Sequence, residues 1–432
     1  MRGLALFSHE EDNADLGGIM KAEIISIGSE LTSGQNLDTN SQWLSRRLAE
    51  IGIPVGWHTT IADNLADNIA AMKVAQERAQ LVLATGGLGP TQDDLTREVL
   101  AACAGVELVF HQESFERMQQ MFARYGRSMP ERNRVQAMHP AGATVLRNDR
   151  GTAPGIWMQI GSCWIAAMPG VPSEMHAMFE EQVKPRLLEQ GMGAGVLVER
   201  KLNCFGAGES AVEQNLLDLT RRGQVPEVGI TVGDATISLR ILARSATVRE
   251  AEAQIAPVEQ TIRERLGDLV FGAGDEDLAD VVLRLLTEKR KTLATAEGVT
   301  AGLVAERLSR VPGASSTFHG GVIAYDNRLK AEMLAVPQSL LDAEGAVSAR
   351  VAETMAASCR IRFRTDYAIS SVGIAGPSGA SPGKPIGLVW VGLAWEGGAS
   401  SRTVSWHGSR TEVQSRTAKL ALNHLRLKLL RE

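Results

Sequence analysis

Short apolar runs alternate with helical patterns along the first part of the chain. The runs at 23–27 and 81–84 are each followed by a polar loop and by a segment whose apolar residues recur at helical spacing, and the run at 53–57 precedes a further helical segment at 66–78. Strands that alternate with helices favour a doubly wound α/β fold around a parallel sheet. Because ligands bind beyond the carboxyl ends of the strands in such sheets, we expect the loops after the first and third runs to share one mouth.

The most informative loop is TGGLGPTQDDLT at 85–96, which follows the third apolar run. Its three glycines allow a tight turn and a close approach to a ligand, and the amides at the start of the next helix suit a phosphate. Asp93 and Asp94 add two adjacent carboxylates, which suit a divalent cation. The alternative is a strand-to-helix turn whose aspartates only cap the helix, and the acids together with the threonine make us weigh it less.

Two further loops offer polar groups after apolar runs. The loop at 28–40 carries Glu30 and Asp38 for metal or ribose contacts, although Asp38 or Asn40 would serve equally well as the cap of the next helix. The segment MPGVPSEM at 168–175 opens another helix, and the same N-terminus is able to receive a phosphate.

The pattern changes between about 180 and 275. A short apolar run at 196–198 precedes the segment 205–210, which opens a helix, and apolar and polar residues alternate at 237–241. Alternation of this kind predicts an antiparallel sheet with one face exposed to water.

Composition narrows the class of protein. The chain is 44% hydrophobic and 22% charged with a net charge of −5, so we expect no broadly basic surface and no direct binding of nucleic acid. The four cysteines are far apart and indicate neither a zinc site nor a disulfide framework, which favours a reducing cytoplasm. No apolar run approaches the roughly 20 residues that span a bilayer, and the acidic opening segment does not look like a signal peptide. We therefore expect a cytoplasmic protein without a membrane anchor.

Three motifs in this order carry a family resemblance: GSELTSGQNLDTN, TGGLGPTQDDLT and MPGVPSEM. Together they resemble the competence/damage-inducible protein A family, CinA. The first domain of that family resembles the molybdopterin-binding fold of MoaB and MogA, and Asp94 and Thr96 fall on its loop pattern. The resemblance implies a metal-dependent pyrophosphatase that cleaves ADP-ribose to AMP and ribose 5-phosphate.

The resemblance and the residue types together give the candidate site. We expect catalytic roles for Asp94 and Asp93, and metal ligation by Glu30, Asp38 and Asp94. Oxygen ligands of this kind accept magnesium, manganese or cobalt. The candidate substrate-binding residues are Gly28, Ser29, Gly86, Gly87, Gly89, Pro90, Thr91, Thr96 and Gly170.

The last part of the chain resembles the carboxy-terminal domain of the same family, an amidohydrolase that converts nicotinamide mononucleotide to its acid form and ammonia. The resemblance rests on GGVIAY at 320–325, on GAVS at 345–348 and on GIAGP at 373–377. The family's nucleophile motif is AESCTGG, whereas this chain reads AEGVTAG, with Gly298 at the position of the catalytic serine. Valine also stands at 372, where the family usually has threonine.

These departures predict that amide hydrolysis is absent or severely reduced. A nucleophilic route to an amide needs a hydroxyl or thiol near a base, and Thr300 lies two positions away, where we expect it to point elsewhere. Tyr325 and Lys330 would have been proton-transfer partners in an active domain, and we interpret them here as packing and surface residues. A retained pocket could still bind a nucleotide without turnover. The degenerate pocket comprises Gly298, Thr300, Tyr325, Lys330 and Gly376.

The resemblance covers the whole chain and sets the expected domains. They are a disordered extension at 1–20, a molybdopterin-binding-like domain at 21–180, a small KH-like α+β connector at 181–275 and a deamidase-like α/β domain at 276–432. Met20 is a candidate for the biological start. Because an acid follows the glycines at 206–208, we favour a connecting or dimerising role for the middle domain over RNA binding.

Three functions remain open at this stage. The first is pyrophosphate hydrolysis of a small-molecule nucleotide, the second is a non-catalytic adaptor with a recombination protein as partner, and the third is nicotinamide mononucleotide deamidation. The resemblance also implies a homodimer. We rank the pyrophosphatase first and the deamidase last.

Overall fold

The computed structural model describes residues 21–193 and 195–432. The expected extension at 1–20, with Met20, lies outside the described residues. The chain forms two compact units, one made of the residues up to Val198 with Arg244–Ala251, the other of Glu199–Ala243 with Glu252–Glu432. Each unit is described here by itself.

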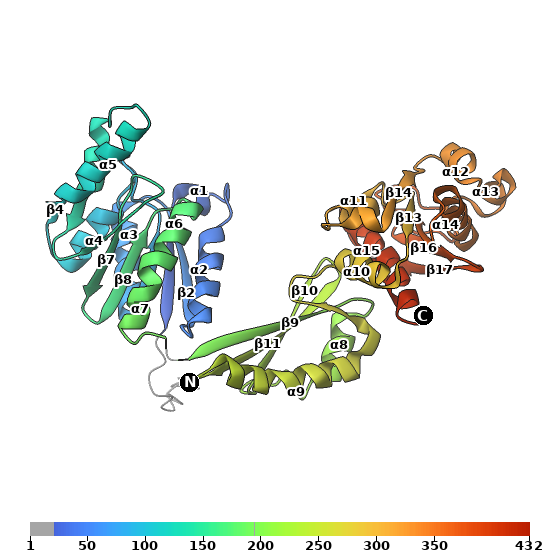
Figure 1. Ribbon diagram of the computed structural model, residues 1–432, viewed down its shortest axis with the longest axis horizontal. Helices are drawn as coiled ribbons and strands as arrows, with labels where there is room; N and C mark the ends of the chain where they lie inside the picture. The colour runs from blue at the N-terminus through green and yellow to red at the C-terminus, as the bar shows by residue number, and fades with distance from the viewer. Residues whose placement is uncertain (1–20, 194) are drawn as a thin grey trace, which may run out of the picture. The chain divides into compact units, whose positions relative to one another are not determined.

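The first unit is built on a six-stranded sheet in the order β2-β1-β3-β8-β7-β6 (Figure 1). β1 is parallel to β2 and β3, and β3 is parallel to β8, whereas β7 and β6 are added as antiparallel strands. The predicted α/β fold is therefore confirmed, with a mixed sheet. Its strands are β1 (Ala22–Ile27), β2 (Val55–Ile61), β3 (Leu81–Thr85), β6 (Thr144–Leu146), β7 (Gly155–Ile160) and β8 (Cys163–Met168).

The register of these strands brings the loops to one edge. Ser26 of β1 is level with Thr85 of β3, and Thr85 is level with Met168 of β8. The loops after β1, β3 and β8 therefore leave the sheet side by side, which confirms the prediction made for the loops after β1 and β3 and adds the loop after β8. Because β7 runs antiparallel to β8, with Ile156 opposite Ala167, the β6–β7 loop turns at this same edge.

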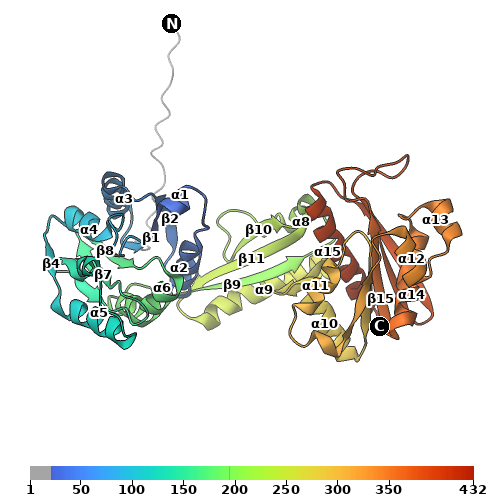
Figure 2. The same ribbon diagram turned by 90° about the horizontal axis from the view of Figure 1, so that it is seen from above.

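Helices cover both faces of this sheet. Leu44 of α2 and Phe179 belong to one buried cluster with sheet residues, and Met72 of α3 and Leu100 of α4 belong to another. Figure 2 shows α2 and α6 on one side of the sheet and α3 and α4 on the other. The helices are α1 (Ser29–Thr32), α2 (Thr39–Glu50), α3 (Leu65–Arg78), α4 (Thr96–Ala104), α5 (Gln112–Arg124), α6 (Pro172–Met178) and α7 (Lys184–Glu189).

One predicted strand begins later than expected. The run at 53–57 was expected to be extended throughout, but β2 begins at Val55. Pro54 has no N–H for the ladder, and the amide of Ile53 instead donates to the carbonyl of Leu48 at 2.9 Å and closes the end of α2. A small two-stranded sheet of β4 (Leu108–Phe110) and β5 (Met138–Pro140) accompanies α5.

The middle domain has the predicted antiparallel sheet, in the order β10-β11-β9-β12. β10 pairs antiparallel with β11, and β12 pairs antiparallel with β9. Alternate residues of β11, namely Ile237, Leu239 and Ile241, are buried, as the apolar alternation predicted. The elements are β9 (Val196–Cys204), α8 (Glu209–Leu216), β10 (Glu227–Gly233), β11 (Thr236–Ser245), α9 (Val248–Leu266) and β12 (Val270–Ala273).

The carboxy-terminal domain has a five-stranded sheet in the order β14-β13-β15-β16-β17. β13 is parallel to β14 and β15, and β16 and β17 are antiparallel additions. Figure 1 shows α10, α11 and α15 on one side of this sheet and α12 to α14 on the other. The strands are β13 (Leu293–Glu297), β14 (Phe318–Ile323), β15 (Tyr367–Gly373), β16 (Leu388–Trp395) and β17 (Gly398–Ser405), and the helices are α10 (Leu278–Lys289), α11 (Leu303–Ser309), α12 (Asn327–Leu334), α13 (Gln338–Glu344), α14 (Ala349–Phe363) and α15 (Arg410–Leu429). None of the described helices combines the length and the apolar character needed to cross a bilayer.

Candidate functional site

The glycine loop after β3 is packed against its neighbours so closely that side chains are excluded. Gly86 has φ 102°, and a Cβ there would lie 2.2 Å from the carbonyl oxygen of Ile27. Its amide donates to the carbonyl of Met168 at 3.0 Å, and a Cβ on Gly170 would lie 3.4 Å from the Gly86 Cα. The structure therefore brings the predicted loops after β1, β3 and β8 into direct contact.

The next glycines wrap the loop around the start of α4. A Cβ on Gly87 would lie 2.3 Å from Thr96 Oγ1, and a Cβ on Gly89 would lie 2.5 Å from Asp94 Oδ2. The Thr96 hydroxyl donates to the Gly86 carbonyl at 2.8 Å and is 1% exposed. Thr96 thus stabilises the loop through a buried hydrogen bond. The predicted substrate-binding residues Pro90 and Thr91 are, by contrast, at least partly exposed to solvent.

A buried guanidinium supports this loop. Arg97 donates to the carbonyls of Leu88 at 2.8 Å, Gly89 at 2.9 Å and Asp94 at 3.2 Å, and it is 1% exposed. Burial lowers its pKa, although the charges of Glu98 and Asp94 act in the opposite direction. The sequence analysis did not predict a role for Arg97. The one feature that could have indicated it is its position directly after Thr96, at the end of the glycine-loop motif.

The guanidinium fixes which way the loop presents its polar groups. The carbonyls of Leu88 and Gly89 turn toward Arg97 and accept hydrogen bonds from its guanidinium. Within the described part of the chain, the amides of Gly87, Leu88 and Gly89 have no acceptor. Consecutive free amides over a positive charge form an anion-binding concavity.

The acids of the candidate site are engaged to different degrees. Asp94 Oδ2 accepts the amide of Thr91 at 2.8 Å and its hydroxyl at 2.5 Å, whereas no described residue donates to Oδ1. Asp93 and Glu30 are exposed, and their carboxylates accept no hydrogen bond from the described residues. Asp94 therefore stabilises the loop with one oxygen and presents the other.

Asp38 is the N-cap of α2, which is one of the two alternatives left open by the sequence. Its carboxylate accepts the amide of Ser41 at 2.9 Å and the hydroxyl at 2.6 Å. Burial raises the pKa of Asp38, but the hydrogen bonds from Ser41 and Ser26 and the charge of His58 outweigh burial and leave the pKa lowered. Asn40 does not cap the helix and instead donates to the carbonyl of Gly170 at 2.8 Å.

The acids do not form a complete metal site by themselves. Across residues 21–193 and 195–432, no three His, Cys, Asp or Glu side chains come together in a way that would hold a metal ion. The carboxylate of Glu30 folds back over Gly28, at 2.6 Å from the position that a Cβ there would occupy. Beside it, the amide and hydroxyl of Ser29 donate to Asp63 Oδ2 at 2.8 Å each. Asp63 follows β2 and was missed from the sequence, since it lies outside the three motifs.

The carboxy-terminal domain contains a separate cavity of about 280 Å³. It brings together four predicted residues, Gly298, Tyr325, Lys330 and Gly376. Thr300 is not among the lining residues: it is 3% exposed, and its hydroxyl bonds to Glu297 Oε2 at 2.7 Å and Ser371 Oγ at 2.6 Å. The assignment of Thr300 to the degenerate pocket is therefore wrong, whereas its hydroxyl lies outside the cavity as expected from its place two positions after Gly298.

Lys330 is a buried residue of this cavity. The sequence assigned it to the degenerate pocket and interpreted it as a packing or surface residue; its side chain lines the cavity and is 4% exposed, so it is not a surface residue. Its amine donates to the carbonyl of Tyr325 and to Asn327 Oδ1, both at 3.1 Å. Burial lowers the pKa of this amine, partly offset by Asp326. The sequence motifs indicated this pocket, but no pattern of apolar residues showed that the amine would be buried in it.

Arg410 is a further lining residue that the sequence did not indicate. It begins α15, and its guanidinium bonds to the hydroxyl of Tyr325 and donates to the carbonyl of Gly376 at 2.8 Å. Tyr325 is 55% exposed at the entrance. Ser378 also lines the cavity, but no described residue is hydrogen-bonded to its hydroxyl, so the cavity has no activated nucleophile.

Comparisons with known families agree with the three domains. Residues 23–189 match the family described as "Probable molybdopterin binding domain", 199–272 match "Damage-inducible protein CinA KH domain" and 275–429 match "CinA C-terminal domain". The class is therefore a protein with a MoaB/MogA-like first domain, a small KH-like middle domain and an α/β CinA domain.

Relatives match over almost the full chain. The CinA-like protein of Dictyoglomus thermophilum is 43% identical over 411 residues, which cover 95% of this chain and 100% of the relative. The CinA-like protein of Frankia casuarinae is 42% identical over 416 residues, with 94% and 96% covered. The solved structure of the competence/damage inducible protein CihA from Agrobacterium tumefaciens is 34% identical, covers 35% of this chain and 93% of that chain, and has a TM-score of 0.34. The chain belongs to the CinA family, as its motifs predicted.

Proposed function

We propose that the amino-terminal domain hydrolyses the pyrophosphate bond of ADP-ribose to give AMP and ribose 5-phosphate. The observation that supports this function is the glycine loop, whose free amides lie over the buried guanidinium of Arg97. A pyrophosphate gathers negative charge as it is cleaved, and preorganised donors of this kind stabilise that charge. The choice of ADP-ribose follows from the family resemblance.

The proposed reaction adds one water to the pyrophosphate. The water oxygen bonds to one phosphorus, the bond from that phosphorus to the bridging oxygen breaks, and the two phosphate monoesters leave. The proton of the attacking water passes to a base. We assign the orientation of this water to Asp94, because its Oδ1 is free while Oδ2 is held by Thr91.

We also propose that activity requires magnesium, manganese or cobalt. The carboxylates do not complete a site alone, and magnesium in phosphate-processing proteins is usually held by one or two carboxylates together with substrate phosphates. Glu30, Asp93 and Asp94 have carboxylate oxygens that accept no hydrogen bond from the described residues, and we assign metal ligation to Glu30 and Asp94. The assay below therefore includes arms with and without each metal.

For the carboxy-terminal domain we propose nucleotide binding without amide hydrolysis. Support comes from the cavity that retains Lys330 and Arg410 but lacks a hydroxyl at 298. We further propose that the protein acts in the cytoplasm as a homodimer, as the resemblance implies.

The test is to incubate the full chain with ADP-ribose or with nicotinamide mononucleotide, with and without divalent metal, and to quantify the nucleotide products by chromatography. We expect metal-dependent AMP and no nicotinic acid mononucleotide. Asp94→Asn keeps the shape of the side chain but removes its charge, so AMP formation should fall by about 100-fold or more.

The matched control is Asp67→Asn, which changes an exposed acid in the first turn of α3. Its rate of AMP formation should equal that of the unchanged protein. Absence of AMP under every metal condition would reject the pyrophosphatase and favour the adaptor. Equal rates in Asp94→Asn and the control would reject the role given to Asp94.

A further inference from the structure

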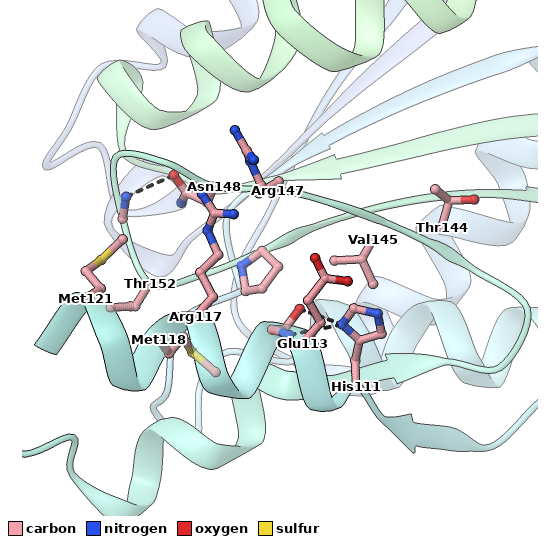
Figure 3. Close-up of a pocket in the computed structure, with 13 residues that line it drawn as sticks. His111, Glu113, Arg117, Met118, Met121, Thr144, Val145, Arg147, Asn148 and Thr152 are labelled. Carbon is pink, nitrogen blue, oxygen red and sulfur yellow. Dashed lines mark hydrogen bonds between the residues drawn. The ribbon is translucent and has the colours of Figure 1, made fainter. Parts of the chain in front are cut away.

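A second cavity of about 270 Å³ lies in the first unit, between α5 and the β6–β7 loop. Figure 3 shows Arg117 and Met118 on α5 and Arg147 and Asn148 on the facing loop. Nothing in the sequence motifs pointed to this cavity. Its lining residues are His111, Glu113, Ser114, Arg117, Met118, Met121, Thr144, Val145, Arg147, Asn148, Gly151, Thr152 and Pro154.

The cavity lies at the same edge of the sheet as the glycine loop. The β6–β7 loop turns where β8 ends, because Ile156 is opposite Ala167. Asn148 donates to Glu174 Oε2 at 2.6 Å, and Glu174 lies in the first turn of α6, four residues after Gly170. Since Gly170 packs on Gly86, the start of α6 connects the glycine loop to the wall of the cavity.

Two guanidinium groups and two carboxylates lie around the entrance of the cavity, because Glu113 lines it together with Arg117 and Arg147 and Asp149 pairs with both arginines. Arg147 pairs with Asp149 at 2.5 Å, and Arg117 pairs with the same carboxylate. Burial and the neighbouring charge of Arg147 lower the pKa of Arg117. Two guanidinium groups thus share one carboxylate, and a phosphate would satisfy both of them better than Asp149 does.

The interior of the cavity suits a planar base. Met118, Met121, Val145 and Pro154 supply apolar surface, and methionine adapts its shape to flat ligands. The loop wall is already ordered, because Asn148 Oδ1 accepts the amides of Arg150 at 3.0 Å and Gly151 at 2.9 Å. The volume is slightly below the roughly 300–1,000 Å³ of sites for whole small molecules, so the cavity fits part of a dinucleotide.

We propose that this cavity is the subsite for the nucleoside monophosphate half of the substrate. The base lies against Met118 and Met121, and the phosphate faces Arg147 and Arg117, while the other half of the dinucleotide lies over the glycine loop. The assignment to AMP rests on the proposed function. The apolar lining favours a nucleoside monophosphate over a sugar phosphate, since a sugar would leave the surface of Met118 and Met121 uncovered.

The test is calorimetric titration of the full chain with AMP and, separately, with ribose 5-phosphate. AMP should bind, and Arg147→Met should weaken its binding at least about tenfold, because a charge-assisted hydrogen bond is lost. Asp149→Asn removes the competing carboxylate and should strengthen AMP binding. The control is Arg124→Met, an exposed arginine of α5 outside the cavity, which should bind AMP as the unchanged protein does.

The outcomes separate this proposal from the proposed function. Loss of AMP affinity in Arg147→Met, with a gain in Asp149→Asn, supports the subsite even if ADP-ribose is not hydrolysed. AMP formation from ADP-ribose with an unchanged KM in Arg147→Met overturns the subsite and leaves the pyrophosphatase intact. No AMP binding at millimolar concentration, or tighter binding of ribose 5-phosphate than of AMP, also overturns it. Arg147 is 62% exposed in its side chain, so the variant should fold, and an unchanged melting temperature verifies this.

Discussion

At the scale of the residue, Gly298 leaves the carboxy-terminal cavity without a hydroxyl at the position where the family motif has its serine. Lys330 supplies a buried amine whose pKa is lowered, as a general base requires, but Gly298 has nothing to deprotonate. A Cβ at 298 would lie 2.8 Å from the Ser371 carbonyl oxygen, which accepts the Gly298 amide, so a side chain there requires the backbone to shift. We expect Gly298→Ser to convert nicotinamide mononucleotide slowly to its acid form with release of ammonia, measured by chromatography and an ammonia assay.

Two variants control this experiment. Gly298→Ala has the same steric demand without the hydroxyl, and Gly298→Ser combined with Lys330→Met has the hydroxyl without the amine; both should be inactive. Conversion by the unchanged protein at an enzymatic rate would contradict the argument from Gly298. Equal activity in the alanine and serine variants would show that the new hydroxyl is not the nucleophile.

Some functional residues could be predicted from the sequence, because their role follows from the residue type alone, and others could not. Gly86 and Gly298 could be recognised because a missing side chain is visible in the sequence. Arg97, Asp63 and Arg410 could not be, because each acts on a group from a distant segment or on a backbone carbonyl. The direction of a carbonyl follows from the fold, and no pattern of residue types reports it.

At the scale of the element, Asp38 caps α2 and is also one of the residues predicted to bind the metal. Asp38→Ala removes the cap and should lower the free energy of unfolding by about 1 kcal/mol, whereas Asp38→Asn should not, because asparagine caps equally well. The pKa of Asp38 is lowered from 3.8, so the cap stabilises above that pH and its contribution is lost as the pH falls through the folded-state pKa. Denaturant unfolding of the three proteins at about pH 7 and about pH 3.5 measures both effects.

The same pair of variants separates capping from metal ligation. If Asp38 only caps α2, Asp38→Asn keeps both stability and metal-dependent AMP formation. A stable Asp38→Asn variant that has lost AMP formation would instead support the predicted metal role. Equal stability of Asp38→Ala and the unchanged protein at neutral pH would contradict the capping energy.

Elements with long apolar runs were predicted well, and short ones were not. β1 and β3 begin and end within one residue of the apolar runs, and α3 begins one residue earlier than expected. The strands β4, β5 and β6 have three residues each, which is too short for a recognisable alternation. The segment that forms the second cavity was therefore left without a prediction.

At the scale of the whole molecule, the middle and carboxy-terminal domains are joined within the second unit by a polar contact around Asp234. The turn between β10 and β11 places Asp234 at φ 49° and Ala235 at φ 58°. The Asp234 carboxylate accepts the hydroxyl of Ser415 at 2.6 Å and pairs with Lys419 at 3.0 Å and Arg307 at 3.3 Å. A carboxylate from a turn of the middle domain thus neutralises one cation on α11 and one on α15.

Asp234→Asn tests this contact, because asparagine tolerates the same backbone conformation but lacks the charge. We expect the free energy of unfolding of this unit to fall by roughly 1–2 kcal/mol at neutral pH, after allowance for partial exposure. Burial raises the pKa of Asp234, but the hydrogen bonds and charges of Ser415, Lys419 and Arg307 outweigh burial and leave it below 3.8. The difference in the free energy of unfolding between the two proteins should therefore be complete above that pH and vanish as the pH falls through the folded-state pKa.

The control is Asp218→Asn, which breaks an exposed pair with Arg265 inside the middle domain and should leave the melting temperature unchanged. Equal melting temperatures for Asp234→Asn and the unchanged protein at neutral pH would show that the charge of Asp234 does not help to hold the two domains together.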